Sequence, residues 1–518
     1  MRILSVQPDT VPALASDAFR TAGGMVEMPC GGRRSCGNCL VWLRGALEEI
    51  GPAEAALLAR REPEPPPLPG FVRRLACCCR LLGPAELLLP EDADEPATAA
   101  FAGQLPSYDG GEPDTLGAAI DVGTTTITLV LFRLGTGDLL ATVSELNRQT
   151  AFGADVISRI NAAQGPGGPL HDCLTAQLRS MLDQALNQAG ESPDSMTRMV
   201  VTGNTTMLHF LRGLDPRGIG VVPFTPASLF GEEIPAQTLF PGIPGALYLP
   251  PCVSAYIGAD ITCGILAARL TEGGTVLLAD VGTNGEMALF ADGRLRCCAV
   301  AAGPAFEGAE ISMGMPALPG AVDRVWDEGS QLGFHVLPGS KPRGICGTGL
   351  MSAVRTLLER GSLDETGRLE AREDDPCLLW NDSGPPAVWL GGSGVTLTQE
   401  DIRKLQLAKA AVAAGIDTLL SEAGLSPKKV ETLWLAGGFG SFLRPEDAAG
   451  SGMLPLSLAE RTRAAGNLAL TGAALLLFSA RPRETAAATA ARAEEIPLAT
   501  HPVFMEQFVE RMGFFAED

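Results

Sequence analysis

Apolar segments alternate with glycine-rich turns and amphipathic stretches from Leu116 to about residue 480. Short apolar segments that end in glycine are typical of buried strands, and amphipathic stretches are typical of helices packed on a sheet. This alternation predicts an α/β fold over most of the chain. The first 90 residues follow another pattern, in which residues 3–7 and 41–45 read as short strands and residues 11–24 as a helix that ends at glycine.

A segment rich in Pro, Glu, Asp, Ala and Gly separates these two parts of the chain. It covers residues 84–116 and has the sequence PEDADEP near its centre. Such a composition favours a linker over a packed core segment. We therefore predict a first domain at residues 1–90 and a linker at residues 91–116.

Composition narrows the range of partners and the location of the protein. The 518 residues carry a formal net charge of −21, which argues against non-specific binding to nucleic acid because such binding needs a basic surface. The first residues lack the pattern of a signal peptide, and no apolar run reaches the ~18 residues needed to cross a membrane. These features predict a cytoplasmic protein that binds neither nucleic acid nor a membrane.

The cysteines are clustered, and six of the 13 lie between residues 30 and 79. The run PCGGRRSCGNC places Cys30, Cys36 and Cys39 in C-x5-C-x2-C spacing, and RLACCCR supplies a fourth cysteine after 37 intervening residues. Four ligands, usually thiolates, hold a 2Fe–2S cluster, and glycines in the loop let backbone N–H groups turn toward the sulfurs. The alternative is a structural zinc site, which more often has two C-x2-C pairs. The spacing therefore predicts an iron–sulfur cluster.

This cysteine pattern resembles that of plant-type and adrenodoxin-type ferredoxins, which have a β-grasp fold and a distant fourth cysteine. The resemblance implies that the strand reading RLAC supplies the fourth ligand, which selects Cys77. Side chains that alternate along a strand would place Cys77 and Cys79 on one face and Cys78 on the other. Cys79 therefore remains the second candidate for the fourth ligand.

Two later segments share an acidic residue before a glycine turn. The sequence AAIDVGTTTITLVLF contains Asp121 and LLADVGTNGEMALF contains Asp280, and each reads as a strand, a turn and a strand. Such turns present backbone N–H groups and hydroxyls to phosphates, while the carboxylate coordinates Mg²⁺, usually through water. One copy is a weak signal because an ordinary hairpin has the same pattern. Two copies about 160 residues apart predict a phosphate site.

A third glycine-rich segment, TLWLAGGFGSF, ends a predicted strand with Gly437, Gly438 and Gly440. Glycines at this point allow a flat base or a ribose to approach the backbone. Small-residue helices are predicted around Gly264, just before the second phosphate turn, and around Gly472, after the third glycine segment.

The order of these segments resembles that of the actin-like ATPase superfamily, which includes sugar kinases, actin and heat-shock chaperones. The resemblance implies two lobes that close on ATP, at residues 117–275 and 276–480, with a tail at 481–518 packed on them. It also implies that Asp121 and Asp280 hold Mg²⁺. The residues that it places around the nucleotide are Gly123, Thr124, Thr125, Thr126, Gly282, Thr283 and Asn284 at the phosphates and Gly437 and Gly438 at adenosine.

The fusion of a ferredoxin to an actin-like ATPase resembles the reductive activators of corrinoid proteins. Similar runs are TGNTTMLHFL at 202–211, AAGPAFEGAEISMGM at 301–315, GICGTGLM at 344–351, DIRKLQLAKAAV at 401–412 and FMEQFVERM at 504–512. The resemblance implies ATP-dependent transfer of one electron from a 2Fe–2S cluster to Co(II), giving Co(I), in a corrinoid protein of a methyltransferase system. It further implies a low-potential electron donor and a homodimer. ATP can assist only through different affinities for two conformations.

The chain departs from this family in one respect, and three other functions remain open. Fuller family members have another domain between ferredoxin and ATPase, whereas about 40 residues separate Cys77 from Leu116 here. The alternatives are an activator of another low-potential enzyme, a small-molecule kinase with a regulatory cluster, and a redox-sensing scaffold that ATP switches. A kinase needs a positioned base, for which Asp260 and Glu286 are the candidates. Glu286 is also the third predicted catalytic residue, beside the two Mg²⁺ aspartates.

Overall fold

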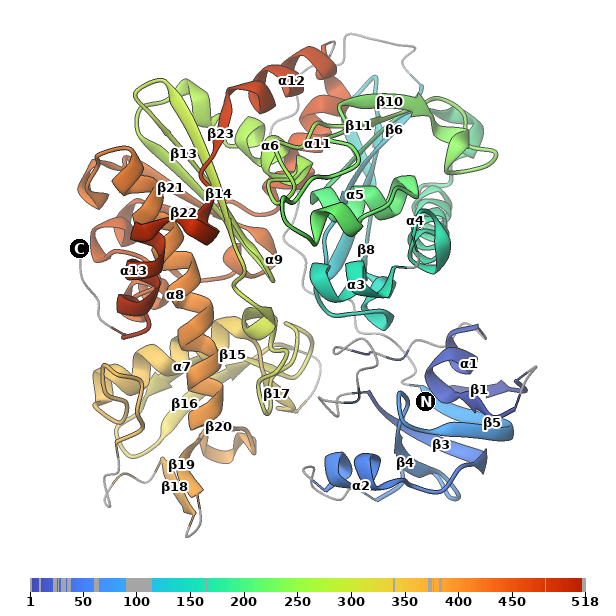
Figure 1. The fold of residues 1–518 in the computed structure, drawn as a ribbon, viewed down its shortest axis with the longest axis vertical. Coiled ribbons are helices and arrows are strands. Elements are labelled where there is room, and N and C mark those ends of the chain that lie inside the picture. The colour runs from blue at the N-terminus through green and yellow to red at the C-terminus, as the bar shows by residue number, and fades with distance from the viewer. Residues whose placement is uncertain are drawn as a thin grey trace.

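The computed structural model consists of two lobes and a separate N-terminal domain (Figure 1). In Figure 1 the N-terminal domain is blue, the first lobe runs from teal to green, and the second lobe runs from yellow-green to red. The described residues are 2–8, 11–21, 26, 28, 34, 39–59, 65–89, 114–163, 165–338, 341–370, 375, 377–381, 384–479 and 481–514.

The N-terminal domain is an antiparallel sheet with strand order β1-β5-β3-β4, and β2 also pairs with β5. Its elements are β1 (Arg2–Val6), β2 (Ala13–Leu14), α1 (Ala15–Thr21), β3 (Leu40–Leu47), α2 (Pro52–Leu58), β4 (Val72–Leu75) and β5 (Arg80–Leu89). The two predicted strands are confirmed, whereas part of the predicted helix is strand β2. Alternate residues of β3 and β5 face α1, so Phe19, Leu43 and Leu87 are fully buried in a core of their own.

The first lobe is built on a six-stranded sheet with order β10-β11-β9-β6-β7-β8. Its elements are β6 (Leu116–Val122), β7 (Thr126–Arg133), β8 (Asp138–Leu146), α3 (Val156–Ala162), α4 (Gly168–Ala189), β9 (Met196–Gly203), α5 (Thr205–Arg212), β10 (Glu232–Pro235), β11 (Ala246–Leu249) and α6 (Ala259–Ala267). Strand β6 is buried on both faces: Ile120 lies in one core cluster and Ala119 in another. This explains why β6 reads as a continuous apolar segment rather than an alternating one.

The second lobe has a sheet with order β22-β21-β12-β13-β14-β23, whose first five strands correspond to β11-β9-β6-β7-β8 of the first lobe. Its strands are β12 (Val276–Val281), β13 (Gly285–Ala291), β14 (Arg294–Val300), β21 (Thr432–Ala436), β22 (Thr462–Ala464) and β23 (Ala493–Glu495). In both lobes three antiparallel strands are followed by a parallel neighbour, β9 beside β6 and β21 beside β12. The chain shows no internal sequence repeat, yet its two lobes share one strand arrangement.

The remaining helices and strands all lie beyond β14 in the sequence. They are β15 (Ala321–Asp327), β16 (Leu332–Val336), β17 (Gly344–Ile345), α7 (Gly347–Arg360), β18 (Leu378–Asn381), β19 (Gly384–Trp389), β20 (Thr396–Thr398), α8 (Gln399–Glu422), α9 (Gly437–Gly440), α10 (Pro445–Gly450), α11 (Leu468–Phe478), α12 (Pro482–Arg492) and α13 (Pro502–Glu510). The last segment adds β23 to the sheet beside β14 and packs α13 on α8. Within the described residues, no helix has the length and apolar character needed to span a membrane.

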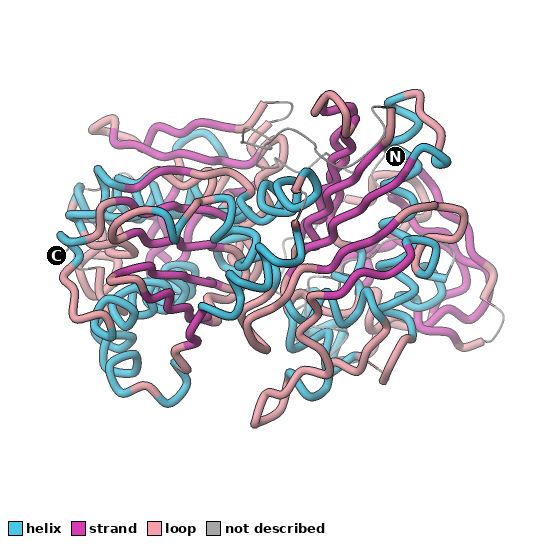
Figure 2. Tube along the Cα trace, turned by 90° about the horizontal axis from the view of Figure 1, so that it is seen from above, coloured by secondary structure: helices cyan, strands magenta, loops and turns pink. Residues whose placement is uncertain are grey.

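Helix α11 lies on the sheet of the first lobe although it follows β22 of the second lobe in the sequence. Phe478 of α11 contacts Phe132 of β7 edge to face, with ring centroids 5.4 Å apart. Helix α6 crosses α11 closely, and a Cβ atom added at Gly472 would overlap the Cys263 carbonyl group. Ile261 of α6 lies in the same core cluster as Leu278 of the second lobe. Viewed from above, the strands form two groups with helices between them (Figure 2).

Candidate nucleotide site and cysteine turn

Two turns of the same kind face each other in a pocket between the lobes. The turn Gly123–Thr125 joins β6 to β7, and the turn Gly282–Asn284 joins β12 to β13, so both predicted hairpins are confirmed. The pocket is lined by all twelve residues that the sequence placed at the nucleotide or in catalysis: Asp121, Gly123, Thr124, Thr125, Thr126, Asp280, Gly282, Thr283, Asn284, Glu286, Gly437 and Gly438.

The first turn is held by polar side chains from three other segments. Asn147 Nδ2 donates to the Gly123 carbonyl at 2.9 Å, and Arg159 Nη2 donates to the Thr124 carbonyl at 2.6 Å. Asn204 Nδ2 donates to Thr124 Oγ1 at 3.0 Å. Burial lowers the pKa of Arg159 to about 10, which leaves the guanidinium charged at neutral pH. The sequence analysis missed these residues because no local pattern joins them to the turn.

The third glycine segment fits close approach by a flat group. Gly437 has a φ angle of +88°, and an added Cβ atom would lie 2.6 Å from the Val281 carbonyl oxygen. Only glycine therefore suits this position. At Gly438 an added Cβ atom would meet nothing within 4 Å, so the backbone there is open to the pocket. The segment forms the start of α9 directly after β21, as a site for a base or ribose requires.

Glu307 joins the two facing turns, Gly123–Thr125 and Gly282–Asn284, and was not singled out from the sequence. It ends a short 3-10 helix at Pro304–Glu307, beyond β14. Its Oε2 accepts hydrogen bonds from Thr125 Oγ1 at 2.8 Å and from Thr283 Oγ1 at 2.7 Å. One carboxylate oxygen thus bridges a turn of the first lobe and a turn of the second.

Four further carboxylates gather in the pocket: Asp121, Asp260, Asp280 and Glu286. Asp280 and Glu286 are directly paired residues of β12 and β13. Asn467 Nδ2 donates to Asp121 Oδ2 at 2.8 Å, which fixes the orientation of that carboxylate.

The pKa values of these four groups are raised because burial disfavours the charged form, and at Asp260, Asp280 and Glu286 neighbouring carboxylates add repulsion. Burial raises the pKa of Asp121 to about 6. Burial and the Asp121 charge raise the pKa of Asp260 to about 7. Burial with the charges of Asp260 and Asp121 raises the pKa of Asp280 to about 8, and burial with the charges of Asp260 and Asp280 raises that of Glu286 well above its usual value.

This cluster calls for a balancing positive charge. Across the part of the chain that the structure describes, no three Asp, Glu, His or Cys side chains come close enough to hold a metal ion directly. Carboxylates that surround an ion at longer range suit Mg²⁺, which keeps several of its waters. The residues therefore fit a hydrated Mg²⁺ beside bound phosphates.

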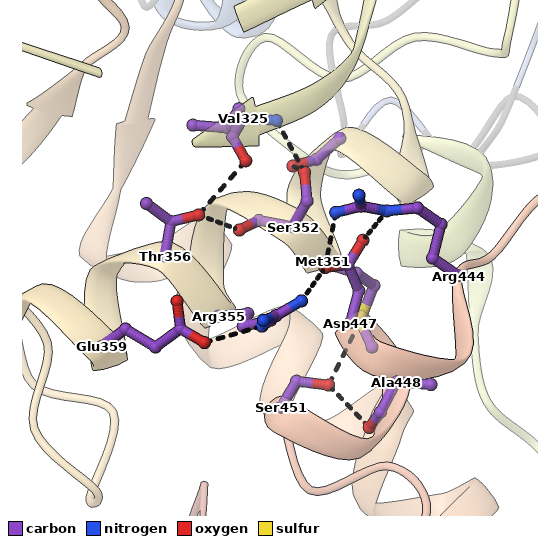
Figure 3. A network of polar contacts seen from close by, with 11 residues as sticks. Val325, Met351, Ser352, Arg355, Thr356, Glu359, Arg444, Asp447, Ala448 and Ser451 are labelled. Atoms are coloured by element: carbon purple, nitrogen blue, oxygen red, sulfur yellow. Dashed lines mark hydrogen bonds and ion pairs between the residues drawn. The ribbon is translucent and has the colours of Figure 1, made fainter. Parts of the chain in front are cut away.

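A network of charged side chains fixes helices α7 and α10 beside the pocket (Figure 3). Helix α7 begins at the pocket with Gly347 and Thr348. Farther along α7, Arg355 Nη1 donates to Asp447 Oδ1 of α10 at 3.2 Å. Arg444 Nε donates to Asp447 Oδ2 at 2.8 Å. Asp447 is only 3% exposed, and its buried charge is paired with these two arginines, whose side chains are partly exposed.

In the N-terminal domain, Cys39 and Cys77 lie side by side. Cys39 Sγ donates to Cys77 Sγ at 3.1 Å, and the Cys77 backbone N–H lies 3.5 Å from Cys39 Sγ. The hydrogen bond with Cys39, followed by burial, raises the pKa of the Cys77 thiol. A bound metal centre would favour the thiolate forms. Cys30 and Cys36 lie outside the described residues, and the two buried sulfurs that are described fit ligands of a metal cluster.

The segment that carries Cys77 is a turn, so the predicted strand alternation there is wrong. Strand β4 ends at Leu75, whose carbonyl accepts from the N–H groups of Cys78 at 2.8 Å and Cys79 at 2.9 Å. In this turn Cys78 Sγ lies 3.8 Å from Cys77 Sγ. Cys79 Sγ instead donates to the Arg80 carbonyl at 3.8 Å. Hydrogen bonds within the turn replace the alternation that a strand would impose.

Two lobes that present equivalent hairpin turns to one pocket, joined to a small cysteine-bearing sheet, define an actin-like ATPase with a ferredoxin-like domain. Residues 274–518 match the family described as the C-terminal domain of RACo, the ASKHA domain. Residues 116–273 match the RACo middle region.

Individual relatives agree with these matches. The corrinoid activation enzyme RamQ of Eubacterium limosum is 32% identical over 431 residues, which are 79% of this chain and 72% of that protein. The Co(II) methylated amine-specific corrinoid protein reductase of Methanosarcina barkeri is 27% identical over 378 residues, 65% of this chain and 66% of that protein. A solved structure of a reductive activator for corrinoid, iron-sulfur protein is 27% identical with a TM-score of 0.69, covering 98% of this chain and 96% of that one. The chain belongs to the RACo family of corrinoid activation enzymes, and the predicted family and fold class are confirmed.

Proposed function

We propose that this chain uses ATP to drive one-electron reduction of Co(II) to Co(I) in a corrinoid protein of a methyltransferase system. Membership of the RACo family carries the corrinoid activation itself. The observation that supports the detailed scheme is the presence, on one chain, of a two-lobed phosphate pocket and a buried pair of converging cysteines.

The electron source that we propose is a 2Fe–2S cluster held by Cys30, Cys36, Cys39 and Cys77. When bound, such a cluster stores one electron and releases it to a partner. The chain supplies the thiol groups, and the contact between Cys39 and Cys77 supports Cys77 over Cys79 as the fourth ligand. Cys79 Sγ turns toward backbone instead and is fully buried in the domain core.

We propose that different residues of the pocket bind the phosphates, the adenosine and the Mg²⁺ of ATP. The hydroxyls of Thr125 and Thr283 and the N–H groups of both turns bind phosphates, and Gly437 and Gly438 receive adenosine. Asp121 and Asp280 orient the water ligands of Mg²⁺, whose charge offsets that of the phosphates. Asp260 and Glu286 are the candidate bases for hydrolysis: burial raises the pKa of both, and that of Asp260 to about 7, where a general base works best.

ATP is needed because reduction to Co(I) is uphill. Each ~59 mV of unfavourable one-electron transfer costs about 1.4 kcal/mol. A nucleotide cannot carry the electron, but it can favour one lobe arrangement if it binds that arrangement more tightly. We infer that the ATP-bound arrangement changes the binding of the corrinoid protein and thereby makes its cobalt easier to reduce.

The test uses the full-length protein loaded with its cluster, a low-potential reductant, and a cognate Co(II) corrinoid protein. The Co(I) absorption band should grow substantially faster with ATP than without it. Cys77→Ser should stop Co(I) formation while ATP hydrolysis persists, and Asp280→Ala should suppress hydrolysis while the visible spectrum of the cluster persists.

Cys79→Ser is the matched control, and it should keep both activities and the reduced-state EPR signal. A native signal in Cys77→Ser with a lost signal in Cys79→Ser would show that the ligand assignment is wrong. Equal rates of Co(I) formation with and without ATP would refute the coupling.

A further inference from the structure

One threonine hydroxyl in each of the two phosphate turns is already engaged in this structure. A threonine hydroxyl has one hydrogen to donate. Thr125 and Thr283 both give theirs to Oε2 of Glu307, at 2.8 Å and 2.7 Å. A phosphate oxygen that binds these turns through the same hydroxyls must take both hydrogens from Glu307.

The Glu307 carboxylate resembles a phosphate group in the hydrogen bonds that it accepts. A carboxylate and a phosphate are both anionic acceptors with more than one oxygen. The second oxygen, Oε1, faces Gly282, where an added Cβ atom would lie 3.8 Å away. The two hydroxyl oxygens that converge on Glu307 are themselves 3.4 Å apart and belong to different lobes. The carboxylate therefore draws both lobes to one point, as a phosphate between the turns would do.

We propose that Glu307 is an internal stand-in for a nucleotide phosphate, which closes the two turns on each other without nucleotide and must leave when the phosphates bind. This inference rests on the proposed nucleotide site and names the residue through which that site senses its occupant. Glu307 is thus a positioning residue, and it competes with the ligand rather than holding it.

The surroundings of Glu307 connect its departure to distant parts of the second lobe. Its neighbour Phe306 stacks on Phe439 of α9, with ring centroids 4.4 Å apart and an interplanar angle of 8°. Five residues farther along the chain, Ser312 Oγ donates to Asp401 Oδ2 at 2.7 Å at the start of α8. The segment that carries Glu307 is therefore anchored at the adenosine side and at α8. Displacement of the carboxylate acts on both anchors.

The competition predicts that removing the Glu307 charge strengthens nucleotide binding. We would titrate the full-length, cluster-loaded protein with Mg²⁺ and a non-hydrolysable ATP analogue by calorimetry. Glu307→Gln and Glu307→Ala should each bind the analogue at least about tenfold more tightly than the wild type, because a charge-assisted contact no longer has to be broken. The control is Glu310→Gln, an exposed carboxylate of the same segment, which should bind like the wild type.

Amide hydrogen exchange supplies a second readout that does not depend on affinity. In nucleotide-free Glu307→Ala, residues 123–126 and 282–284 should exchange faster than in the wild type, because the turns lose their shared acceptor. With the analogue bound, wild type and variant should exchange alike. Equal exchange in the nucleotide-free forms would overturn the proposed closure.

The remaining outcomes separate this inference from the proposed function. If the wild type binds the analogue and Glu307→Gln binds it equally or more weakly, the stand-in role is wrong and the nucleotide site stands. Unchanged affinity with lost hydrolysis would instead make Glu307 a catalytic base and overturn the inference. If the wild type binds no nucleotide, both the proposed nucleotide site and the stand-in role of Glu307 are wrong.

Discussion

The protonation state of the pocket carboxylates depends on which positive charge neutralises them. Burial raises the pKa of Asp121 to about 6, and burial with the charges of neighbouring carboxylates raises the pKa values of Asp260 and Asp280 to about 7 and 8, from an ordinary value of 3.8. At pH values between the ordinary pKa of 3.8 and the raised pKa of about 8, the folded chain binds more protons than the unfolded chain. The free energy of unfolding of the nucleotide-free protein therefore falls as the pH rises from about 4 to about 8.

Asp280→Asn tests this balance because it removes a charge without changing shape. At pH 8 the variant should be more stable than the wild type by about 1 to 3 kcal/mol, less than the full pKa shift implies because pocket water screens the charge. The difference should be smaller at pH 5 and should vanish only below about pH 4, where Asp280 is protonated in both the folded and the unfolded chain. Urea unfolding of the nucleotide-free proteins measures the difference, and ATP hydrolysis by the variant should be strongly reduced.

Asp292→Asn, in the exposed turn between β13 and β14, is the control and should unfold like the wild type at both pH values. If Asp280→Asn and the wild type have the same pH dependence, the charge cluster does not govern stability in this range.

The residues of the pocket differ in how far the sequence could reveal them. Asp121, Asp280 and the glycines after them stand in short strand-and-turn patterns, and all line the pocket. Asn147, Arg159 and Glu307 reach the same turns from other segments of the chain. Nothing local in the sequence relates them to the turns, because only the folded lobes bring them together.

At the scale of elements, hairpins and helices were predictable, while their contacts were not. The apolar runs around Asp121 and Asp280 predicted both hairpins, because strands and turns each leave a local signal in the sequence. The turn at 76–78 leaves no local signal, because Ala76, Cys77 and Cys78 include neither the glycine nor the proline that would mark a turn. The small-residue helices around Gly264 and Gly472 were also predicted, and the structure adds that α6 and α11 touch at backbone distance.

Gly472→Ala tests that contact. A Cβ atom there would overlap the carbonyl group of Cys263, which is backbone and cannot turn aside. The helices must separate, at a cost of about 1 to 3 kcal/mol in the free energy of unfolding. Because α6 and α11 connect the lobes, affinity for an ATP analogue should also fall.

Gly392→Ala is the matched control, because an added Cβ atom there meets nothing within 4 Å. Its stability and nucleotide affinity should equal those of the wild type. A Gly472→Ala protein with native stability would mean that α6 and α11 pack less closely than the structure indicates.

At the scale of the whole molecule, the redox and nucleotide parts have separate cores. The core cluster of the N-terminal domain includes residues from Ala15 to Leu87, whereas the four other clusters draw on residues from Leu116 onward. A ligand that stabilises one part therefore need not stabilise the other. Separate cores of this kind also favour two unfolding transitions over one.

Heating with and without nucleotide should separate these transitions. An ATP analogue at 100 times its dissociation constant should stabilise the ATPase part by ~2.7 kcal/mol and raise its midpoint temperature. Loss of the visible absorption of the cluster should occur at an unchanged temperature. Differential scanning calorimetry and absorption on the same sample measure both, and a shift of the two signals together would show that the parts unfold as one.

The position of α11 has a further consequence for how the chain acquires its structure during synthesis. The strands of the first lobe are complete at Leu249, but the helix that covers one face of their sheet begins only at Leu468. At ribosomal rates of about 5 to 20 residues per second, that face waits roughly 10 to 45 s for its cover. Phe132 and Val200 are exposed to other nascent chains for that time, so the newborn first lobe is an expected client of chaperones.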